Sequence, residues 1–549
     1  MKKYTKYFLT AVLLTAFSSC KEDFLEYVPE DRPTVNSWYR NKSEIRQATA
    51  SMYGRVWWSV NDQFSWLAGD VMSGDMHHNW DAEGQFFYMS FNESNQYIAQ
   101  GWQGFYDVIS FANLIIDDMP TIASGYGVDQ TVINEGLGEA RFMRGIAYFM
   151  LVEYWGEAPI IEKAAEKVAK GELLLPKNTT ASLYEFARRD LVFAAENLPV
   201  TDDPGRVTQW AAKGMLAKLH LSLAQRSVGG GSIGSANDFT IAANYAADVI
   251  NNSGRVLNSS YEDLFKVQNE HNPEILFAPQ LINGGWGFGS SRQARFARST
   301  IVTGDATAWG SGKCATVSLI NTVSSNAGGK TDLRRKAIYM QNGDFYNYIS
   351  TENGGYTYNI VTRDADNNVI EGATPTLTSL KKQIVGNDKD NGGYAITNQD
   401  SPLDIYYLRL ADVYLLYAEA LMGSNNELTS GPGLAALNAV RARAGLDPRS
   451  TVTYVQLFNE RRIELALEAQ SWLDIKRRYY RNATEALNYL NAQNRTDMYF
   501  RIDSDDAFEN DPAGYELVPA GTTSPNNNQN TDPVVVFTAS KMRLPIPGN

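Results

Sequence analysis

Cysteine is scarce in this sequence, with only Cys20 and Cys314 among 549 residues. Cys20 ends an N-terminal apolar run that is expected to be processed, which leaves Cys314 without an internal disulfide partner. A disulfide framework is therefore excluded, and stability must come from apolar packing. With 44% hydrophobic residues, the chain is long enough to bury one or two cores.

Histidine is scarce as well, with four residues, so few imidazole groups are available for general acid–base catalysis. No Gly-x-Ser-x-Gly nucleophile elbow is present. His77 and His78 are adjacent, would point to opposite sides of an extended segment, and have no further histidine or cysteine at metal-ligand spacing. The sequence thus predicts no catalytic residues, no metal site and no cofactor. Structural calcium is compatible with the aspartate clusters, but nothing requires it.

Long apolar runs and an excess of basic residues are also missing. Beyond Cys20 no stretch approaches the roughly 20 apolar residues of a membrane-spanning helix. The 62 acidic residues outnumber the 49 basic ones, which gives a net charge of −13. Because nucleic acids are held largely by Lys and Arg on their phosphates, this balance argues against a nucleic-acid partner.

The N-terminus has the layout of a cleaved secretory signal. Lysines among the first six residues precede an apolar run over 8–17, and small residues lead to Cys20, as in a bacterial lipobox. We predict a signal peptide over 1–19, lipid attachment at Cys20 and a lipidated tether over 20–42. Several acyl chains would anchor the protein stably to a membrane. The alternative is an ordinary secretory signal followed by an incidental cysteine.

Helical periodicity dominates two parts of the chain, 43–254 and 401–496. Ser43 is the expected N-cap of the first helix, and Pro120 is expected to end the second. The helices come in pairs with small residues in mid-helix, which is typical of degenerate tetratricopeptide-like units. The predicted fold class is therefore mainly α, a scaffold of tetratricopeptide-like helix pairs. The expected helices cover 43–58, 95–119, 131–155, 179–198, 207–227, 238–251, 403–423, 433–444 and 453–480.

Three stretches interrupt the helical pattern. Residues 255–400 are rich in Gly, Asn, Ser, Thr and Asp, and predict a loop-rich insertion with a few strands. Residues 61–94 form a second irregular stretch, and the tail over 497–549 is expected to be extended. We expect a single domain over 43–549. Loops carried on a rigid scaffold are a common place for function.

Five motifs carry a family resemblance. They are Cys20 followed by Asp23-Phe-Leu-Glu26 and Pro29; Arg141-Phe-Met-Arg-Gly-Ile-Ala-Tyr-Phe149 with Trp155-Gly-Glu-Ala-Pro159; Leu408-Arg-Leu-Ala-Asp-Val-Tyr-Leu-Leu-Tyr-Ala-Glu-Ala-Leu421; Glu460-Arg-Arg-Ile-Glu-Leu-Ala-Leu-Glu468 with Trp472-Leu-Asp-Ile-Lys-Arg477; and Leu544-Pro-Ile-Pro547. In this order, and over nearly the whole length, they resemble the SusD/RagB family of outer-membrane lipoproteins from Bacteroidota. Ala469 and Ser471 depart from the family pattern, which commonly has Gly and Arg there.

The resemblance implies a SusD-like α-α superhelix that supports an irregular loop region. It also implies non-enzymatic capture of a nutrient at the cell surface and delivery to a SusC-like TonB-dependent outer-membrane transporter. Lys21-Glu22-Asp23 resembles the Bacteroidota signal for export to the outer face, so the lipid-anchored protein is expected to face the cell exterior. The expected ligand is an oligosaccharide or polysaccharide. Peptide capture is the alternative within the family.

The motif that begins at Glu460 contains several carboxylates, which suggests catalysis at first sight. Glu460, Glu464 and Glu468 recur every four residues, however, and so share one face of a helix. Arg461 lies three residues before Glu464, a spacing that suits a local ion pair. We therefore interpret the motif as structural.

Aromatic residues in the loops are the candidates for ligand binding. A sugar ring presents an apolar face of C–H groups that packs on a rigid aromatic ring, while polar side chains bind its hydroxyls. For each ring taken alone, packing of a loop onto the helices is an equal alternative. Trp57 and Trp58 are assigned to packing on the first helix. The predicted ligand-binding residues are Trp66, Asn79, Trp80, Trp286, Arg292 and Trp309.

Two functions from other classes remain open at this point. A tetratricopeptide-like scaffold that binds only proteins would use the same helix pairs. A hydrolase would need paired carboxylates, and these cannot be chosen among 62 acidic residues by sequence. The glycan receptor is the favoured hypothesis, and it predicts binding without turnover.

Overall fold

The computed structural model describes residues 38–548 with gaps. The predicted signal peptide, the lipid attachment at Cys20 and most of the predicted tether lie outside the described residues. Much of the predicted tail does so too. The gaps are at 173, 299, 304–307, 311–312, 342, 360–361, 364–368, 372–377, 397–398, 497–498, 501–514 and 517–533.

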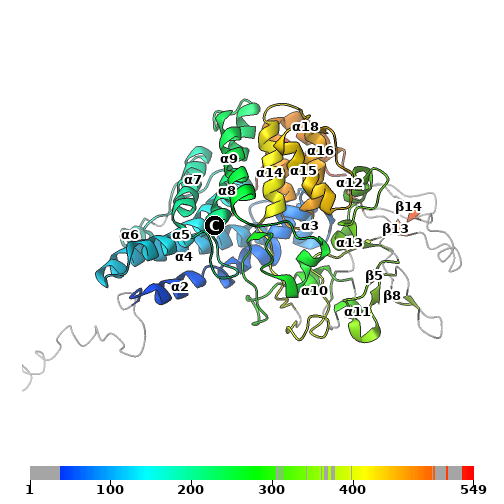
Figure 1. Ribbon diagram of the computed structural model, residues 1–549, viewed down its shortest axis with the longest axis horizontal. Coiled ribbons are helices and arrows are strands. Elements are labelled where there is room, and N and C mark those ends of the chain that lie inside the picture. The colour runs from blue at the N-terminus through cyan, green and yellow to red at the C-terminus, as the bar shows by residue number, and fades with distance from the viewer. Residues whose placement is uncertain are drawn as a thin grey trace, which may run out of the picture.

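Helices form the scaffold, which confirms the mainly α fold class (Figure 1). Among the described residues, no helix is both long and apolar enough to cross a membrane. The longer helices are α4 (Gln96–Gly125), α5 (Gln130–Tyr154), α7 (Thr180–Asn197), α8 (Gln209–Val228), α9 (Asn237–Asn252), α12 (Val317–Ala327), α14 (Leu410–Met422), α15 (Pro432–Arg443), α16 (Tyr454–Glu464) and α17 (Ser471–Arg481). The shorter ones are α2 (Lys42–Ala50), α3 (Asp81–Tyr88), α6 (Ala164–Ala169), α10 (Arg292–Phe296), α11 (Thr300–Thr303), α13 (Arg335–Ile338) and α18 (Ala483–Asn491).

Strands are short and pair only two at a time, always antiparallel, in the part of the chain that is described. Most belong to the predicted insertion. The pairs are β1 (Met76–His77) with β3 (Cys314–Ala315), β2 (Ile275–Phe277) with β10 (Leu408–Arg409), β4 (Tyr339–Gln341) with β9 (Thr378–Leu380), β5 (Phe345–Tyr346) with β6 (Tyr356–Thr357), β7 (Thr362–Arg363) with β8 (Val369–Glu371), β11 (Glu427–Leu428) with β12 (Val452–Thr453), and β13 (Tyr499–Phe500) with β14 (Tyr515–Glu516).

The helices pack in sequence order into a superhelix. Helix α5 packs between α4 and α7, α8 between α7 and α9, and α14 between α9 and α15. Figure 1 shows α8, α9, α14 and α15 side by side above the lengthwise pair α4 and α5. Small residues allow this approach, as sequence reasoning expected. At Gly145 of α5, for example, an added Cβ would lie 3.0 Å from Leu191 Cγ of α7.

Several helix ends differ from the prediction. Asn41, and not Ser43, caps α2 by accepting the backbone N–H of Glu44. Helix α4 continues through Pro120 to Gly125, since buried Met119 and Ala123 pack against the scaffold on both sides of the proline. Tertiary contacts here outweigh the local cost of proline.

The expected helix 453–480 is split in two. Helix α16 ends at Glu464 and α17 begins at Ser471, and between them Leu467 and Ala469 take a left-handed backbone with φ of 60°. The expected helix 403–423 also begins later, at Leu410. Apolar periodicity continues across such breaks because both halves face the same core, and the sequence pattern therefore does not show them.

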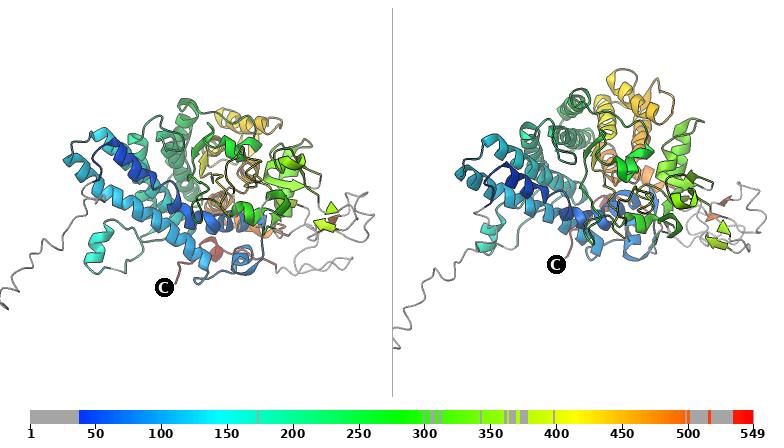
Figure 2. Two further views of the ribbon diagram at one scale, coloured as in Figure 1. Left: turned by 90° about the horizontal axis from the view of Figure 1, so that it is seen from below. Right: turned by 60° about the horizontal axis from the view of Figure 1, so that its bottom comes forward.

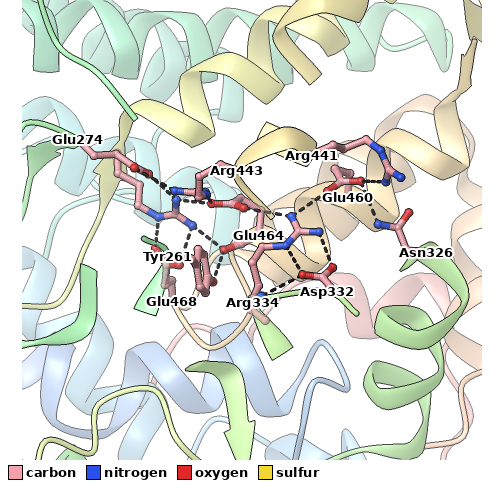
Figure 3. Close-up of polar contacts among 12 residues, drawn as sticks. Tyr261, Glu274, Asn326, Asp332, Arg334, Arg441, Arg443, Glu460, Glu464 and Glu468 are labelled. Atoms are coloured by element: carbon pink, nitrogen blue, oxygen red, sulfur yellow. Dashed lines mark hydrogen bonds and ion pairs between the residues drawn. The ribbon is translucent and has the colours of Figure 1, made fainter. Parts of the chain in front are cut away.

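The glutamates of the α16 motif lie in a buried ion-pair network, which agrees with the structural interpretation (Figure 3). Glu464 pairs with Arg409 at 2.5 Å, with Arg334 at 3.1 Å and with Arg443. Glu460 lies 2.7 Å from both Arg334 and Arg441. The expected local pair of Arg461 with Glu464 is wrong, because Arg461 instead bridges Asp412 (2.7 Å) and Asp474 (2.9 Å).

This network fastens the insertion to the helices. Arg409 pairs with Glu274 at 2.8 Å, and Arg334 is held by Asp332 at 2.7 Å; Glu274, Asp332 and Arg334 all belong to the insertion (Figure 3). The loops therefore sit on a fixed base although their own regular structure is sparse. In both views of Figure 2 the green segments of the insertion lie against the helical scaffold.

The C-terminal motif docks near the end of α5. The backbone N–H of Leu544 donates to the carbonyl of Tyr154 at 2.9 Å, and the indole N–H of Trp155 donates to the carbonyl of Pro545 at 3.0 Å. Two motifs that lie almost 400 residues apart thus form one contact.

Candidate functional site

Three tryptophans stand out by their exposure. Trp80 is 73% exposed, Trp286 62% and Trp309 46%, and all three were predicted from sequence as ligand-binding residues. By contrast, the side chains of Trp57, Trp66, Trp155, Trp210 and Trp472 are buried. A single exposed apolar side chain is ordinary, whereas exposed rings that gather with other apolar groups often mark a binding site.

The first group of exposed rings surrounds Trp286, and we call it the Trp286 group. The ring of Trp286 lies 5.1 Å from that of half-buried Trp58, at an interplanar angle of 59°. Phe288 is 36% exposed, and the guanidinium of Arg55 lies 5.4 Å from its centroid. A Cβ at Gly287, whose φ is 94°, would lie 3.5 Å from Arg55 Nε and 3.8 Å from Trp58 Cγ, so the loop passes over both residues. The Trp286 group therefore consists of two exposed rings and the two residues on which they pack.

The loop that carries Trp286 is held by the segment that begins at Asp400. The Asp400 carboxylate accepts the backbone N–H of Gly285 at 2.5 Å, and its carbonyl accepts the side-chain amide of Asn283 at 2.9 Å. Ser290 and Ser401 exchange two backbone hydrogen bonds, at 2.7 and 3.0 Å. The tip and the far end of the loop are thus both fixed.

The near end of the loop is fixed by a second buried carboxyl group. Asp404 accepts the backbone N–H of Leu281 at 2.8 Å and the side-chain amide of Gln280 at 3.2 Å. The backbone N–H of Gln280 in turn donates to the carbonyl of Tyr53 at 2.6 Å, close to Arg55 and Trp58. The Trp286 loop and the 53–58 segment are therefore positioned together.

The second group surrounds Trp309, and we call it the Trp309 group. The backbone N–H of Trp309 donates to the carbonyl of Ala294 in α10 at 2.6 Å, and the guanidinium of Arg295 lies 6.0 Å from its ring. Arg295 also approaches Glu83 at 3.6 Å and Asp62 at 3.7 Å. Its charge is therefore shared between two carboxylates beside an exposed ring.

Trp80 belongs to the Trp309 group because it lies at the start of α3, the helix that contributes Glu83. The Trp80 carbonyl accepts the backbone N–H of Gly84 at 2.8 Å. A Cβ at Gly84 would come within 2.5 Å of the Asn79 backbone, so glycine is required for this close turn. The turn fixes the Trp80 backbone and leaves the indole exposed. Asn79 is half-buried beside it.

Glu83 is the polar centre of the Trp309 group. It accepts hydrogen bonds from Gln63, from His78 and, at 3.3 Å, from the hydroxyl of Tyr97. Burial acts to raise the pKa of Glu83, but the hydrogen bond from His78 and the nearby cations bring it below the ordinary value. Burial lowers the pKa of Lys313, which lies nearby, to about 8. The group thus offers both hydrogen-bond donors and acceptors next to exposed rings.

The Trp286 and Trp309 groups flank the same short helix. The Trp286 loop leads directly into α10, and Trp309 binds the backbone of that helix. In Figure 1, α10 lies below α14 and α15. We call the two groups together the aromatic platform.

Two of the predicted ligand-binding residues are buried in the structure and do not belong to the exposed surface. Trp66 lies between two π-helical turns, Val60–Phe64 and Leu67–Val71, and its indole N–H donates to the carbonyl of Asp62 at 2.9 Å. Composition suggested that residues 61–94 are irregular, but the structure shows them to be largely helical. The ring of Trp66 therefore packs in the core.

Arg292 is the second buried residue. It begins α10 but turns inward, and its guanidinium donates to the Ser65 hydroxyl at 2.7 Å. The part of the surface that sequence reasoning assigned to Arg292, near Trp286, is occupied by Arg55 instead.

His77 and His78 do point to different neighbours. The His77 ring packs against Phe87 at 4.9 Å, while His78 contacts Glu83 and lies 5.7 Å from the ring of Trp66. Within the described residues, no group of three or more histidine, cysteine, aspartate or glutamate side chains could hold a metal ion.

Sequence reasoning missed Trp58, Arg55, Glu83 and Arg295. For Trp58 a signal existed: adjacent residues of a helix point about 100° apart, so Trp57 and Trp58 could not both face the core. Trp57 is buried and Trp58 is turned toward Trp286. The other three residues have no local signal, since their partners come from distant segments.

Comparison with known proteins identifies related chains. A model described as "SusD family" matches residues 237–549, and one described as "Starch-binding associating with outer membrane" matches residues 23–221. A SusD-like protein of Bacteroides ovatus is 33% identical over 90% of this chain and 86% of its own length.

Solved structures agree with the fold. A crystal structure with xylogluco-oligosaccharide has 29% sequence identity and a TM-score of 0.77, over 92% of this chain and 95% of that one. The structure of a laminarin-binding SusD-like protein has 21% identity and a TM-score of 0.62, over 83% of this chain and 96% of that one; it bears on the fold alone.

Proposed function

The chain belongs to the SusD family, and on that basis we propose that it is a cell-surface receptor that captures a glycan on its aromatic platform. The observation that carries the proposal is the exposure of Trp80, Trp286 and Trp309 while the apolar core encloses most other tryptophans. Rigid indole rings pack on the C–H face of a sugar at low cost in conformational entropy. Glu83 and Arg295 provide hydrogen-bonding partners for hydroxyl groups beside them.

The proposed ligand is an oligosaccharide or polysaccharide built on a glucan backbone. A relative with 29% identity has been solved with a xylogluco-oligosaccharide, which supports xyloglucan as the first ligand to test. Both platform groups contain exposed rings and are attached to α10, one through the loop that leads into it and one through its backbone, and more than one ring suits a long chain better than a single sugar.

We further propose that the protein is anchored to the outer membrane through lipid on Cys20 and passes its ligand to a SusC-like TonB-dependent transporter. The lipobox-like sequence before Cys20 supports the anchor. The description of the family model that matches residues 23–221 supports association with the outer membrane. Co-purification of the transporter with the lipidated protein from solubilised outer membranes tests this step. Recovery of soluble partners alone would favour a protein-binding scaffold instead.

Isothermal titration of the mature chain with a panel of polysaccharides tests the glycan proposal. We expect measurable affinity for xyloglucan or a related glucan, and no release of shorter products from the bound glycan over a long incubation. Binding of peptides, with no measurable binding of any glycan in the panel, would contradict the proposal. Product release would favour a hydrolase.

Asp400 is expected to act on binding through the position of Trp286. Replacing Asp400 by alanine removes the acceptor of the Gly285 N–H, so glycan affinity should fall about fivefold, or about 1 kcal/mol, while Asp400→Asn keeps an acceptor oxygen and should restore most of it. Titration measures the affinity, and tryptophan fluorescence reports the altered setting of Trp286. Asp388→Ala, on an exposed turn, is the matched control. Equal affinity of Asp400→Ala and wild type would refute a positioning role.

A further inference from the structure

A cavity lies between the turn that precedes α8 and the segment 271–280, and none of the exposed tryptophans lines it. Its volume is about 250 Å³. This is below the roughly 300–1,000 Å³ of pockets for drug-sized ligands and equals the space of about eight waters at 30 Å³ each. The cavity therefore suits a molecule of one sugar ring or smaller. Trp210, Thr208, Arg255, His271, Gln280 and Asp404 are among its lining residues.

Arg255 brings an uncompensated charge to this cavity. Its guanidinium donates only to the backbone carbonyls of Pro273 and Ile275, and it forms no ion pair with any described carboxylate. Burial lowers the pKa of Arg255, but an arginine remains charged at neutral pH. A half-buried guanidinium held only by carbonyls has strong donors left for an anionic group.

Thr208 lies in the wall of the same cavity, at the start of α8. It is the N-cap residue of α8, where a threonine hydroxyl usually accepts a backbone N–H of the first turn. Here the hydroxyl caps nothing, is buried at the cavity wall, and has no hydrogen-bond partner in the structure. Because this oxygen is itself buried, a ligand in the cavity cannot reach it, and Thr208 contributes to the wall of the cavity and not to its hydrogen bonds.

The acidic residues of the cavity are already engaged. Asp202 is held by Arg46 at 2.7 and 3.1 Å, and Asp203 by the same guanidinium at 2.5 Å. Asp404 accepts the Gln280 amide, and burial together with the neighbouring Glu270 favours neutral carboxyl groups at that pair, because burial raises the pKa of both. These groups leave the charge of Arg255 without a counterion.

His271 is another of the residues that line the cavity. It has a left-handed backbone with φ of 63°, and its imidazole forms no hydrogen bond with a described residue. Burial lowers the pKa of His271, so at neutral pH the ring is an uncharged donor and acceptor.

From these observations we propose that this cavity binds a small hydroxycarboxylate of about one sugar ring, with its carboxylate on Arg255 and its hydroxyl groups on Gln280 and His271. The cavity does not contain the exposed tryptophans, although Gln280 and Asp404 in its wall also hold the near end of the Trp286 loop. The proposal does not depend on glycan binding at the aromatic platform. An acidic monosaccharide such as a hexuronic acid has this chemistry.

Isothermal titration of the mature chain with D-glucuronate, with D-glucose and with acetate tests the proposal. Glucuronate is expected to bind with a Kd of about 1 mM or tighter. Glucose, which lacks the carboxylate, and acetate, which lacks the ring, should each bind at least about tenfold more weakly. Glucose or acetate binding as tightly as glucuronate would overturn the proposal, and so would the absence of glucuronate binding.

Two variants locate the site. Arg255→Gln should weaken glucuronate binding at least about tenfold. Because Arg255 also holds two backbone carbonyls, His271→Phe serves as a second variant. It removes an imidazole that forms no hydrogen bond with a described residue, so folding should be retained while binding weakens. Trp286→Ala, on the platform, should leave glucuronate binding unchanged. Unchanged binding in both Arg255→Gln and His271→Phe would refute the site.

Discussion

Replacing Glu464 by glutamine is expected to lower the free energy of unfolding by about 3–5 kcal/mol. Glu464 is fully buried and shares its carboxylate among Arg334, Arg409 and Arg443. Glutamine keeps the shape but removes the charge, which leaves buried guanidinium groups without compensation. Breaking a buried ion pair on one side costs much more than the net contribution of the intact pair.

Chemical denaturation followed by circular dichroism measures this loss, and the midpoint should move clearly to lower denaturant concentration. Glu185→Gln is the matched control: Glu185 pairs with Arg188 at 2.8 Å on the exposed face of α7, where an ion pair contributes about 0–1 kcal/mol. If both variants unfold at the same midpoint, the network does not stabilise the fold as argued.

The same residue predicts a dependence on pH. Burial acts to raise the pKa of Glu464, but Arg443, Arg409 and Arg334 hold it well below the ordinary value. A carboxyl group whose pKa is lower in the folded state stabilises the fold above its unfolded pKa of about 4.3, and this contribution is lost as the pH falls below it. The difference between wild type and Glu464→Gln should therefore be full at pH 7 and shrink below about pH 4. A constant difference over this range would contradict the argument.

The partners of Glu464 show why sequence reasoning reached only part of this result. The four-residue spacing of Glu460, Glu464 and Glu468 is local, and it correctly indicated a structural role, although Glu468 lies beyond the end of α16 and not on its face. Arg334 binds Glu464 from the insertion, and Glu274 binds Arg409 from the same insertion, in each case across more than 100 residues. Nothing in the neighbourhood of Arg334 or Glu274 marks them as members of the network. The local rule instead suggested Arg461, which pairs with Asp412.

The residues of the candidate site were likewise placed correctly from the sequence only in part. Trp80, Trp286 and Trp309 lie in turns or loops that composition identified, and their exposure agrees with that prediction. Trp66 was misplaced because residues 61–94 were expected to be irregular, whereas two π-helical turns run through the core and are buried along their whole length. The family resemblance extended fold prediction further than the residues alone, but it could not assign single side chains to the surface or to the core.

Removing one indole from the platform is expected to produce the largest loss of function. Trp286→Ala should weaken binding of a long glycan by about 2 kcal/mol, roughly 30-fold, since exposed aromatic anchors dominate binding energy. Trp309→Ala should have a similar effect. Trp58→Ala keeps Trp286 but removes the ring that supports it at 5.1 Å, so a smaller loss is expected. Phe111→Ala, an exposed aromatic residue on α4 outside the platform, is the matched control and should bind as wild type does.

The length of the glycan determines whether the two groups act as one platform. A long chain that spans α10 contacts both the Trp286 and the Trp309 group, so the losses of Trp286→Ala and Trp309→Ala should add in the double variant and abolish measurable binding. A short oligosaccharide can occupy only one group, and it should be sensitive to one of the two substitutions and indifferent to the other. Titration of both variants with oligosaccharides of increasing length measures this change. If Trp286→Ala and Trp309→Ala affect every length equally, or if neither affects the longest chain, the exposed rings do not form the proposed glycan platform.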